Sequence, residues 1–164
     1  MSSEIDTLRG IEGRRPYIGS RMRIGLQWVR DYVYASVVAA GFEDLGRFHV
    51  GMFQYPTADG VRPTELAESL QITKQSVNGL LRDMEARGYL TLVPDPSDGR
   101  ARIIRLTAEG HALEQVTHEA ARAASEAFAQ VLGARRYAAL YAALDEIVTS
   151  IVAGDMPMPP DADG

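Results

Sequence analysis

The segment from Arg62 to Gly110 constrains the fold more than any other part of the chain, because the spacing of its apolar residues changes at defined points. Apolar residues at i, i+3, i+4 and i+7 predict one buried stripe on a helix from Lys74 to Arg87. The stripe consists of Val77, Leu80, Leu81 and Met84. The spacing therefore predicts a helix that is anchored on one face and polar on the other.

A shorter helix is predicted just before this one. Proline is favourable at the first position of a helix, so the sequence predicts a helix from Pro63 to Leu70. Gln71 and Ile72 would then form the connection, and the hydroxyl of Thr73 can cap the second helix.

The outward face of the second helix carries residue types that hydrogen-bond to DNA bases. Gln75, Gly79 and Arg82 lie opposite the stripe, flanked by Ser76 and Asn78. Arginine pairs with guanine, glutamine and asparagine pair with adenine, and serine bonds to base edges or phosphate. Gly79 costs about 1 kcal/mol relative to alanine, and close approach to another surface is its simplest explanation. Asn78-Gly79 is also a hairpin-turn dipeptide, but the apolar stripe runs unbroken through it.

A β-hairpin is predicted after the second helix. Gly88 ends the helix, and apolar alternation predicts one strand over Tyr89–Val93 and a second from Ile103 to Leu106. Asp98-Gly99 is the expected tip, and Val61 can add a small third strand.

Two cations, Arg100 and Arg102, lie beside the expected tip. They can enter a minor groove or lie along phosphates. Asp98 can instead pair with one of them and stiffen the hairpin. Both interpretations hold together if the aspartate positions one arginine and the other binds DNA.

This order of helix, turn, helix and basic hairpin is typical of a winged helix-turn-helix. The run TELAESLQITKQSVNGLLRDMEARGYL followed by DPSDGRARIIRLTAEG resembles the MarR family of bacterial transcription regulators. The wing of that family has the form Asp-x-Arg-x-x-x-x-x-Leu-Thr-x-x-Gly, which this chain matches with Asp98, Arg100, Leu106, Thr107 and Gly110.

The resemblance implies an obligate homodimer that binds double-stranded DNA at a pseudo-palindromic operator, often with release by a small ligand. We expect a transcriptional repressor of this kind. The residues predicted to contact DNA are Thr73, Lys74, Gln75, Ser76, Asn78, Gly79, Arg82, Arg100 and Arg102.

Composition excludes several other classes of protein. No apolar run reaches transmembrane length, and the first residues carry charges where a secretory signal needs an apolar segment, so we expect a cytoplasmic protein that does not bind membranes. The absence of cysteine excludes a disulfide framework, a zinc ribbon and a thiol redox switch. No cofactor is expected.

The net charge of −5 is unevenly distributed along the chain. Seven basic and six acidic side chains lie between Gly60 and Leu106, whereas three basic and nine acidic side chains lie from Thr107 onward. The acidic part would repel DNA, so we expect it to lie away from the helix and wing. The slight positive excess of the central part predicts that two modules act together.

The expected fold is mainly α with a small β wing, and it has four parts. Residues 1–16 form an N-terminal arm that touches a partner or phosphates, or is a functionless tail. Residues 17–43 and 107–153 form a helical dimerisation region, residues 44–106 the winged helix-turn-helix domain, and residues 154–164 a disordered tail. Helices are expected over about 16–42, 44–54, 107–132 and 134–152. The first and last carry more apolar surface than a monomer needs, which favours burial against a second subunit.

A small aromatic effector is a further expected partner. The residues predicted to line its crevice are Trp28, Tyr32, His49, Met52 and Phe53, although for any single one of them an ordinary place in the core is the favoured interpretation. His49 or Arg23 can hold an aromatic carboxylate.

A metal-responsive regulator is an alternative, but His111 and His118 lie about 10 Å apart along a helix, too far to share one ion without residues such as Glu114 between them. We therefore assign no metal ligand.

Two other functions were weighed against the DNA-binding interpretation. An enzyme would need a nucleophile with a base, paired carboxylates or a phosphate-binding loop, and none of these motifs is present, so no catalytic residue is predicted. A winged helix can also bind proteins instead of DNA, and the acidic balance favours that alternative. Its outward face would then be apolar or acidic, unlike the face of Gln75 and Arg82.

Overall fold

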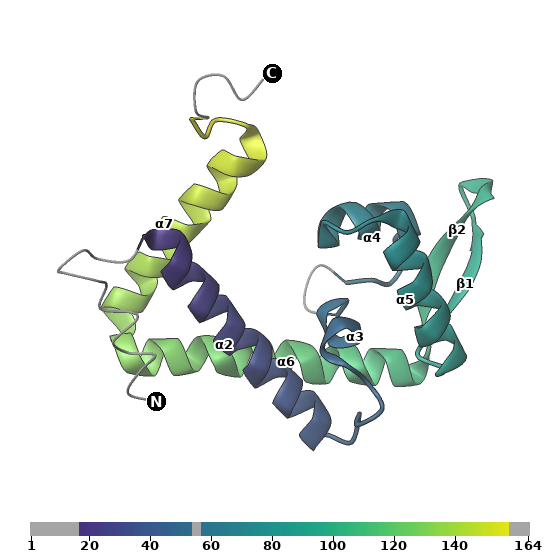
Figure 1. Ribbon diagram of the computed structural model, residues 1–164, viewed down its shortest axis with the longest axis horizontal. Helices are drawn as coiled ribbons and strands as arrows, with labels where there is room; N and C mark the ends of the chain where they lie inside the picture. The colour runs from purple at the N-terminus through teal and green to yellow at the C-terminus, as the bar shows by residue number, and fades with distance from the viewer. Residues whose placement is uncertain (1–16, 54–56, 158–164) are drawn as a thin grey trace. The chain divides into compact units, whose positions relative to one another are not determined.

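The computed structural model describes residues 17–53 and 57–157 and is mainly helical, with one two-stranded antiparallel sheet (Figure 1). Its elements are α2 (Ile18–Ala39), α3 (Arg47–Gly51), α4 (Pro63–Leu70), α5 (Lys74–Ala86), β1 (Leu90–Asp95), β2 (Asp98–Leu106), α6 (Ala108–Leu132) and α7 (Ala134–Ala153). The chain divides into two compact units, residues 1–124 and residues 125–164, with the boundary inside α6. None of the helices in the described ranges is long and apolar enough to cross a membrane.

The helix-turn-helix is formed by α4 and α5, as the sequence predicts. Pro63 is the first residue of α4, and the Glu65 carboxylate accepts a hydrogen bond from the Arg62 backbone N–H at 2.9 Å. Gln71 makes the turn with a left-handed backbone, φ +54°. Thr73 then caps α5, because its hydroxyl accepts the Ser76 backbone N–H at 3.1 Å.

The predicted apolar stripe of α5 is buried. Val77, Leu80, Leu81 and Met84 are each at most 4% exposed and belong to the main hydrophobic cluster. The same cluster includes residues of α2, α3, α4, β1, β2 and α6, so the stripe holds α5 against the body of the first unit. Gly88 ends the helix region with φ +83°, as expected.

The hairpin pairs Leu90 with Leu106 and Asp95 with Asp98, which corrects the position of its tip. The sequence predicts the turn at Asp98-Gly99, but both residues belong to β2 and the turn is formed by Pro96 and Ser97. Proline fixes φ for such a turn, and the Asp95 carboxylate accepts both the backbone N–H and the hydroxyl of Ser97.

In place of the predicted third strand, Gly60 and Val61 make two backbone hydrogen bonds with Ile104. The Gly60 N–H donates to the Ile104 carbonyl at 2.8 Å, and the Ile104 N–H donates to the Val61 carbonyl at 2.9 Å. Within the described ranges the sheet itself contains two strands.

Helix α3 is shorter than predicted. The sequence predicts a helix over 44–54, whereas α3 begins at Arg47 and ends at Gly51. Asp44 cannot join it because its carboxylate binds Arg87 and Tyr89, and Gly46 has an extended backbone. Met52 and Phe53 continue as a turn, and Gln54 lies outside the described residues.

The remaining helices follow their predicted ranges closely. Helix α2 ends just before Gly41, which has φ +102°. Thr107 caps α6 by accepting the Gly110 backbone N–H at 3.1 Å, and Gly133, with φ +76°, separates α6 from α7. The arm at 1–16 and most of the predicted tail lie outside the described residues.

Candidate nucleic-acid interface

The outward face of α5 is open to solvent along its length. Lys74, Gln75, Ser76, Asn78, Gly79 and Arg82 are all exposed, as is the capping residue Thr73. The hydroxyls of Thr73 and Ser76 lie 2.9 Å apart at the start of the helix, so each is already engaged by the other. Lys74, Gln75, Asn78 and Arg82 therefore carry the side-chain groups of this face that remain available for base edges.

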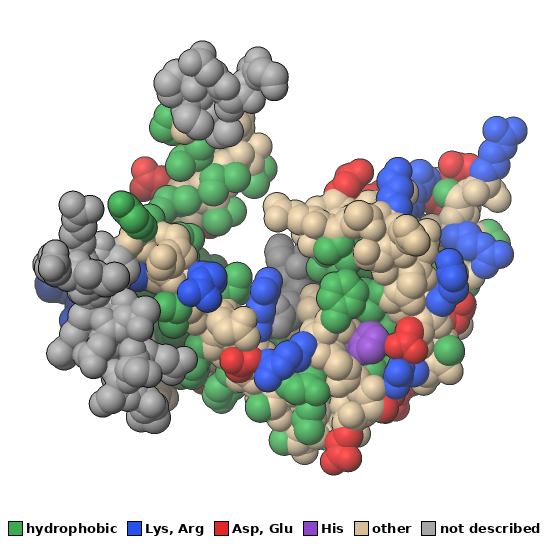
Figure 2. Space-filling model, in the orientation of Figure 1, with side chains coloured by type: hydrophobic (Ala, Val, Ile, Leu, Met, Phe, Trp, Pro, Cys, Tyr) green, Lys and Arg blue, Asp and Glu red, His purple; other side chains and the backbone are tan. Residues whose placement is uncertain are grey.

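The two predicted wing arginines have different surroundings. The Arg102 guanidinium donates to the Leu92 carbonyl at 3.0 Å and so links the two strands of the hairpin. The Arg100 side chain is exposed, and its backbone N–H donates to Asp98 Oδ1 at 3.1 Å. Asp98 therefore positions Arg100 through the main chain, which leaves the Arg100 guanidinium at the end of the wing. Figure 2 shows basic side chains projecting from the hairpin beside a few acidic ones.

The tip of the wing is held by Arg62, a residue that the sequence did not predict to belong to the site. Its Nε and Nη2 atoms lie 2.8 and 2.6 Å from Asp95 Oδ2, and Nη2 lies 3.9 Å from Asp98. Hydrogen bonds from Ser97, followed by the Arg62 guanidinium, lower the pKa of the Asp95 carboxyl to about 2. The start of α4 and the tip of the wing are thereby joined by a carboxylate that is only 8% exposed.

The far end of α5 is fixed by a second polar network. Arg87 donates to the Asp44 carbonyl at 2.7 Å and lies 3.1 Å from Asp83 Oδ2, so its guanidinium lowers the pKa of Asp83. The Tyr89 hydroxyl donates to Asp44 Oδ1 at 2.8 Å. Burial, with this hydrogen bond as the next cause, raises the pKa of Tyr89 to about 12.

His49 belongs to this network. Its Nδ1 accepts the Gly46 backbone N–H at 2.9 Å, and its Nε2 lies 2.8 Å from Asp83 Oδ2. Because Nδ1 is an acceptor, Nε2 carries the proton and donates it to the carboxylate. Nδ1 therefore caps the start of α3, and Nε2 joins α3 to α5.

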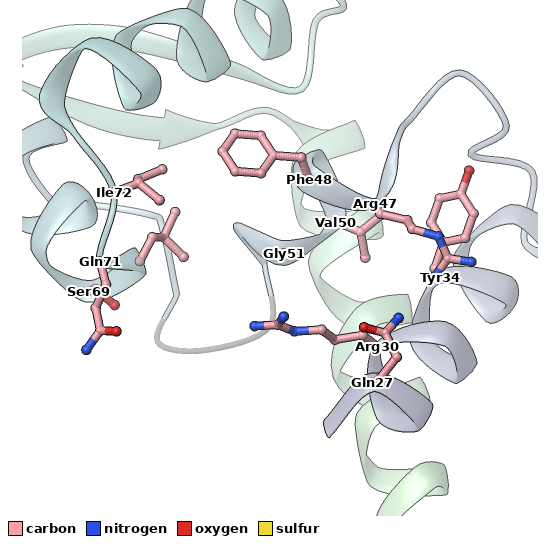
Figure 3. A pocket seen from close by; sticks show the side chains of 11 residues that line it. Gln27, Arg30, Tyr34, Arg47, Phe48, Val50, Gly51, Ser69, Gln71 and Ile72 are labelled. Atoms are coloured by element: carbon pink, nitrogen blue, oxygen red, sulfur yellow. The ribbon is translucent and has the colours of Figure 1, made fainter. Parts of the chain in front are cut away.

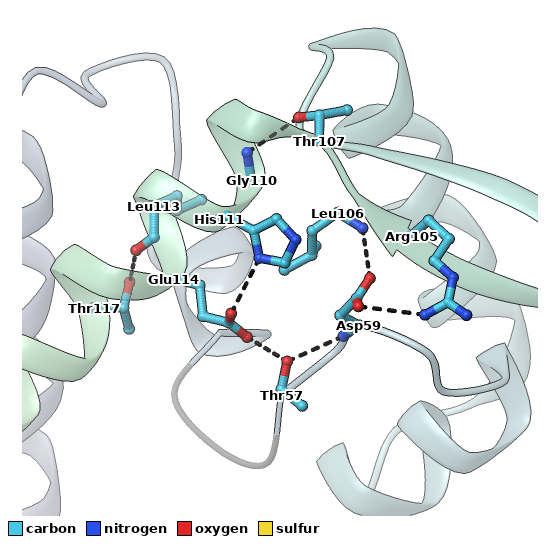
Figure 4. Close-up of polar contacts among 10 residues, drawn as sticks. All are labelled: Thr57, Asp59, Arg105, Leu106, Thr107, Gly110, His111, Leu113, Glu114 and Thr117. Carbon is cyan, nitrogen blue, oxygen red and sulfur yellow. Dashed lines mark hydrogen bonds and ion pairs between the residues drawn. The ribbon is translucent and has the colours of Figure 1, made fainter.

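The junction between β2 and α6 is also held by polar contacts, shown in Figure 4. The Leu106 N–H donates to Asp59 Oδ1 at 2.9 Å, and the Glu114 carboxylate binds the Thr57 hydroxyl and lies 3.6 Å from His111 Nδ1. In the described ranges no three His, Cys, Asp or Glu side chains are grouped as metal ligands.

A cavity of about 620 Å³ opens beside the helix-turn-helix (Figure 3). It is lined by Gln27, Arg30 and Tyr34 of α2, by Arg47, Phe48, Val50 and Gly51 of α3, and by Ser69, Leu70, Gln71 and Ile72 at the end of α4 and the turn after it. Phe48 is 54% exposed and points its ring toward Ile72 in Figure 3. Arg47 lies over the Tyr34 ring at 4.5 Å from its centroid and also pairs with Asp31. Apolar surface and guanidinium groups therefore occur together in this cavity.

None of the five residues predicted to bind an effector lines this cavity. Met52 and Phe53 are at most 1% exposed and belong to the core. His49 is held by Gly46 and Asp83, and Trp28 and Tyr32 pack ring to ring, with centroids 5.3 Å apart, on an exposed part of α2. The lining residues of α2 were missed in the sequence-based prediction. The spacing of apolar residues predicts the helix, but it does not predict which of its side chains face another element across a cavity.

Comparison with known proteins gives three findings. Residues 56–101 match the model of the MarR family. The transcriptional activatory protein BadR of Rhodopseudomonas palustris is 34% identical over 68 residues, which are 41% of this chain and 39% of that protein. The chain thus aligns with about two-fifths of the length of this curated relative.

Solved structures share the fold. Wild-type MarR from E. coli in its apo form has a TM-score of 0.65 at 18% identity, over 82% of this chain and 98% of that one. The transcriptional repressor CouR bound to a 23-mer DNA duplex has a TM-score of 0.62 at 23% identity, over 80% and 92%. CouR from Rhodococcus jostii RHA1 bound to p-coumaroyl-CoA has a TM-score of 0.63 at 22% identity, over 85% and 92%.

Proposed function

We propose that this protein, whose winged-helix region matches the MarR family model, is a sequence-specific DNA-binding transcriptional regulator that acts as a homodimer on a pseudo-palindromic operator. The observation that carries the proposal is the exposed polar face of α5 opposite a buried apolar stripe. In this arrangement α5 enters the major groove, and Gln75, Asn78 and Arg82 contact base edges. Arg100 of the wing contacts the phosphates or the minor groove beside it.

A second copy of the chain explains two features of the molecule. Large apolar side chains are exposed on α2 (Ile18, Met22, Ile24, Leu26, Trp28) and on α7 (Leu140, Tyr141, Leu144, Val148, Ile151, Val152). Exposed apolar patches mark interaction surfaces, and burial against the same helices of a partner would cover them. A dimer also doubles the phosphate contacts of a module that carries little net positive charge.

The cavity supports the proposal of a small effector with an aromatic body and an anionic group. Phe48 and Ile72 offer apolar surface, and Arg30 offers a cation that binds carboxylate or phosphate. The structural relative CouR carries p-coumaroyl-CoA in its solved complex, a ligand that has both features. Because Gln71 and Ile72 lie in the turn before α5, a ligand that contacts them would act directly on the start of the DNA-binding helix.

Repression is the mode we propose, and activation is the alternative, since one relative is named an activatory protein. A reporter gene placed behind the operator distinguishes them. Loss of the regulator raises reporter expression under repression and lowers it under activation.

The DNA-binding proposal is tested by selecting fragments of genomic DNA on the purified protein and titrating the recovered operator by fluorescence anisotropy. We expect the dimeric Gln75→Ala/Arg82→Ala variant to lose operator binding by about 100-fold, because each well-placed base contact contributes about 1–3 kcal/mol. A Gln130→Ala/Arg135→Ala variant removes the same residue types from exposed positions in α6 and α7 and should bind like the parent. If the first variant binds normally, α5 is not the DNA-reading helix and the protein-interaction alternative gains support.

A further inference from the structure

Gly79 lies near the middle of α5, on its exposed face. Glycine is among the least favourable residues for a helix interior, because it loses the most backbone freedom on folding. Glycine is expected in such a place when the backbone has a positive φ, when neighbouring atoms leave no room for a Cβ, or when another molecule approaches closely.

The first two reasons do not apply to Gly79. Its backbone is helical, and it is not one of the described glycines with positive φ. A Cβ built at Gly79 would meet no described atom within 4 Å. Gly110 provides the contrast, because a Cβ there would lie 2.0 Å from the Tyr89 carbonyl oxygen. Neighbouring atoms of the chain therefore require a glycine at Gly110, whereas no described atom of the chain requires a glycine at Gly79.

We propose that Gly79 is a specificity-determining residue: the point where the backbone of α5 lies closest to the floor of the major groove, in contact with the C5-methyl group of a thymine. This inference rests on the proposed function and names one group that the site recognises. Gln75, Ser76 and Arg82 lie three or four positions away on the same face, so Gly79 is in the centre of the base-reading surface.

The chemistry of the position favours a methyl group over a polar one. Gly79 has no side chain, and its backbone N–H and carbonyl lie in the interior of a helix, where they bond within the helix. It can therefore offer only apolar Cα surface and free space. The thymine methyl is the apolar group that bases present in the major groove, and the adjacent Gln75 and Asn78 are of the types that pair with adenine, the partner of thymine.

The test compares Gly79→Ala with the parent protein on the operator duplex recovered by selection. The alanine variant should melt about 2–4 °C higher, because its helix is more favourable, yet bind the operator about tenfold more weakly, because the added methyl collides with the thymine. His118→Ala is the matched control, since His118 is exposed within α6, away from the apolar side chains of α2 and from α5 in sequence, and alanine is likewise the better helix former there. It should gain thermal stability and keep the parent affinity.

A second set of duplexes carries deoxyuridine in place of one thymine at a time, which removes only the methyl group. At one position in each half-site, deoxyuridine should weaken the binding of the parent protein to the operator. On that same duplex, the affinity of Gly79→Ala should lie within about twofold of the affinity of the parent. Equal or tighter operator binding by Gly79→Ala, or a penalty that no deoxyuridine position relieves, would overturn the inference. In that case loss of binding by Gln75→Ala/Arg82→Ala would still support the proposed function, whereas a parent protein that retains no DNA fragment would overturn both.

Discussion

At the scale of single residues, the wing and the helix after it depend on residues that close contacts hold in one position. Gly110 matches the last position of the family wing pattern, and the structure supplies the reason. The residue is buried where α6 passes the end of α5 and the start of β1, with the Tyr89 carbonyl directly against its Cα. Thr107, in the same pattern, bonds to the Gly88 carbonyl at 2.7 Å and caps α6. These two residues set the direction in which α6 leaves the wing.

Gly110→Ala should destabilise the protein strongly. The new methyl would meet a backbone carbonyl, which cannot rotate away as a flexible side chain can, so a cost of at least about 1–3 kcal/mol is expected. Thermal denaturation by circular dichroism measures it, with Gly25→Ala as the control that has open space around the added methyl. An unchanged melting temperature for Gly110→Ala would contradict the close contact.

Asp95 makes stability depend on pH in a defined window. Its folded pKa of about 2 is below the value expected in the unfolded chain, so its ionised form stabilises the fold above about pH 4, and this contribution is lost as the pH falls toward 2. Asp95→Asn should be less stable than the parent at pH 7, and the gap should shrink between pH 4 and pH 2. Urea denaturation at several pH values measures the gap, and a constant gap would contradict the assigned pKa.

At the scale of secondary-structure elements, α5 is held at both ends and along one side, so that its polar face is fixed outward. The cap at Thr73 sets its start, the stripe anchors its length, and the network of Asp44, Asp83 and Arg87 sets its end. The wing is fixed to α4 through Arg62 and Asp95. The elements that would read DNA are thus mutually oriented within one unit.

The sequence predicted the elements whose signals are local. Proline at the start of α4, a threonine cap and a four-residue stripe in α5, and glycines at helix ends are each visible within a few residues. The tip of the hairpin was predicted incorrectly although its signal is local, since Asp95, Pro96 and Ser97 form a turn sequence. The length of α3 was predicted incorrectly because distant Arg87 and Tyr89 hold Asp44. The cavity lining was missed for the same reason, since it depends on which side chains of α2, α3 and the α4–α5 turn face one another.

The turn between α4 and α5 carries a strained residue. Gln71 has φ +54°, a conformation that costs a residue with a Cβ about 1–2 kcal/mol, whereas glycine adopts it freely. Gln71→Gly should therefore raise the free energy of unfolding by about 0.5–1 kcal/mol after the greater backbone entropy of glycine is subtracted. Gln115→Gly, the same change inside α6, should lower it by about 1 kcal/mol. Urea denaturation measures the free energy of unfolding of both variants. A lower value than the parent for both would contradict the strain at Gln71.

At the scale of the whole molecule, charge and apolar surface point to assembly. The central segment has nearly balanced charge, and the C-terminal part is acidic, so one copy would bind DNA weakly. Apolar side chains are exposed on α2 and on α7, and we propose that two copies join through these side chains. The fourfold division of the chain into arm, dimerisation region, DNA-binding domain and tail remains a prediction.

Salt should weaken operator binding steeply. Each phosphate contact made by a basic side chain releases counterions, so the logarithm of the binding constant falls linearly with the logarithm of the salt concentration. Arg100→Ala in both wings of a dimer should reduce the slope by about 2, one unit for each phosphate contact removed. Anisotropy titrations between about 50 and 200 mM salt measure the slope. A flat salt response of the parent would contradict the proposed phosphate contacts.

The central claim, that the outward face of α5 lies in the DNA groove, can be tested directly because the chain contains no cysteine. Lys74→Cys places one thiol per chain at the first turn of α5, where an attached iron chelate cleaves nearby DNA. We predict cleavage at two symmetric positions in the operator, about 10 base pairs or a multiple of that apart, and no such cleavage from the same label on Glu146→Cys in α7. Cleavage spread evenly along the duplex, or confined to the α7 label, would show that α5 does not lie in the groove.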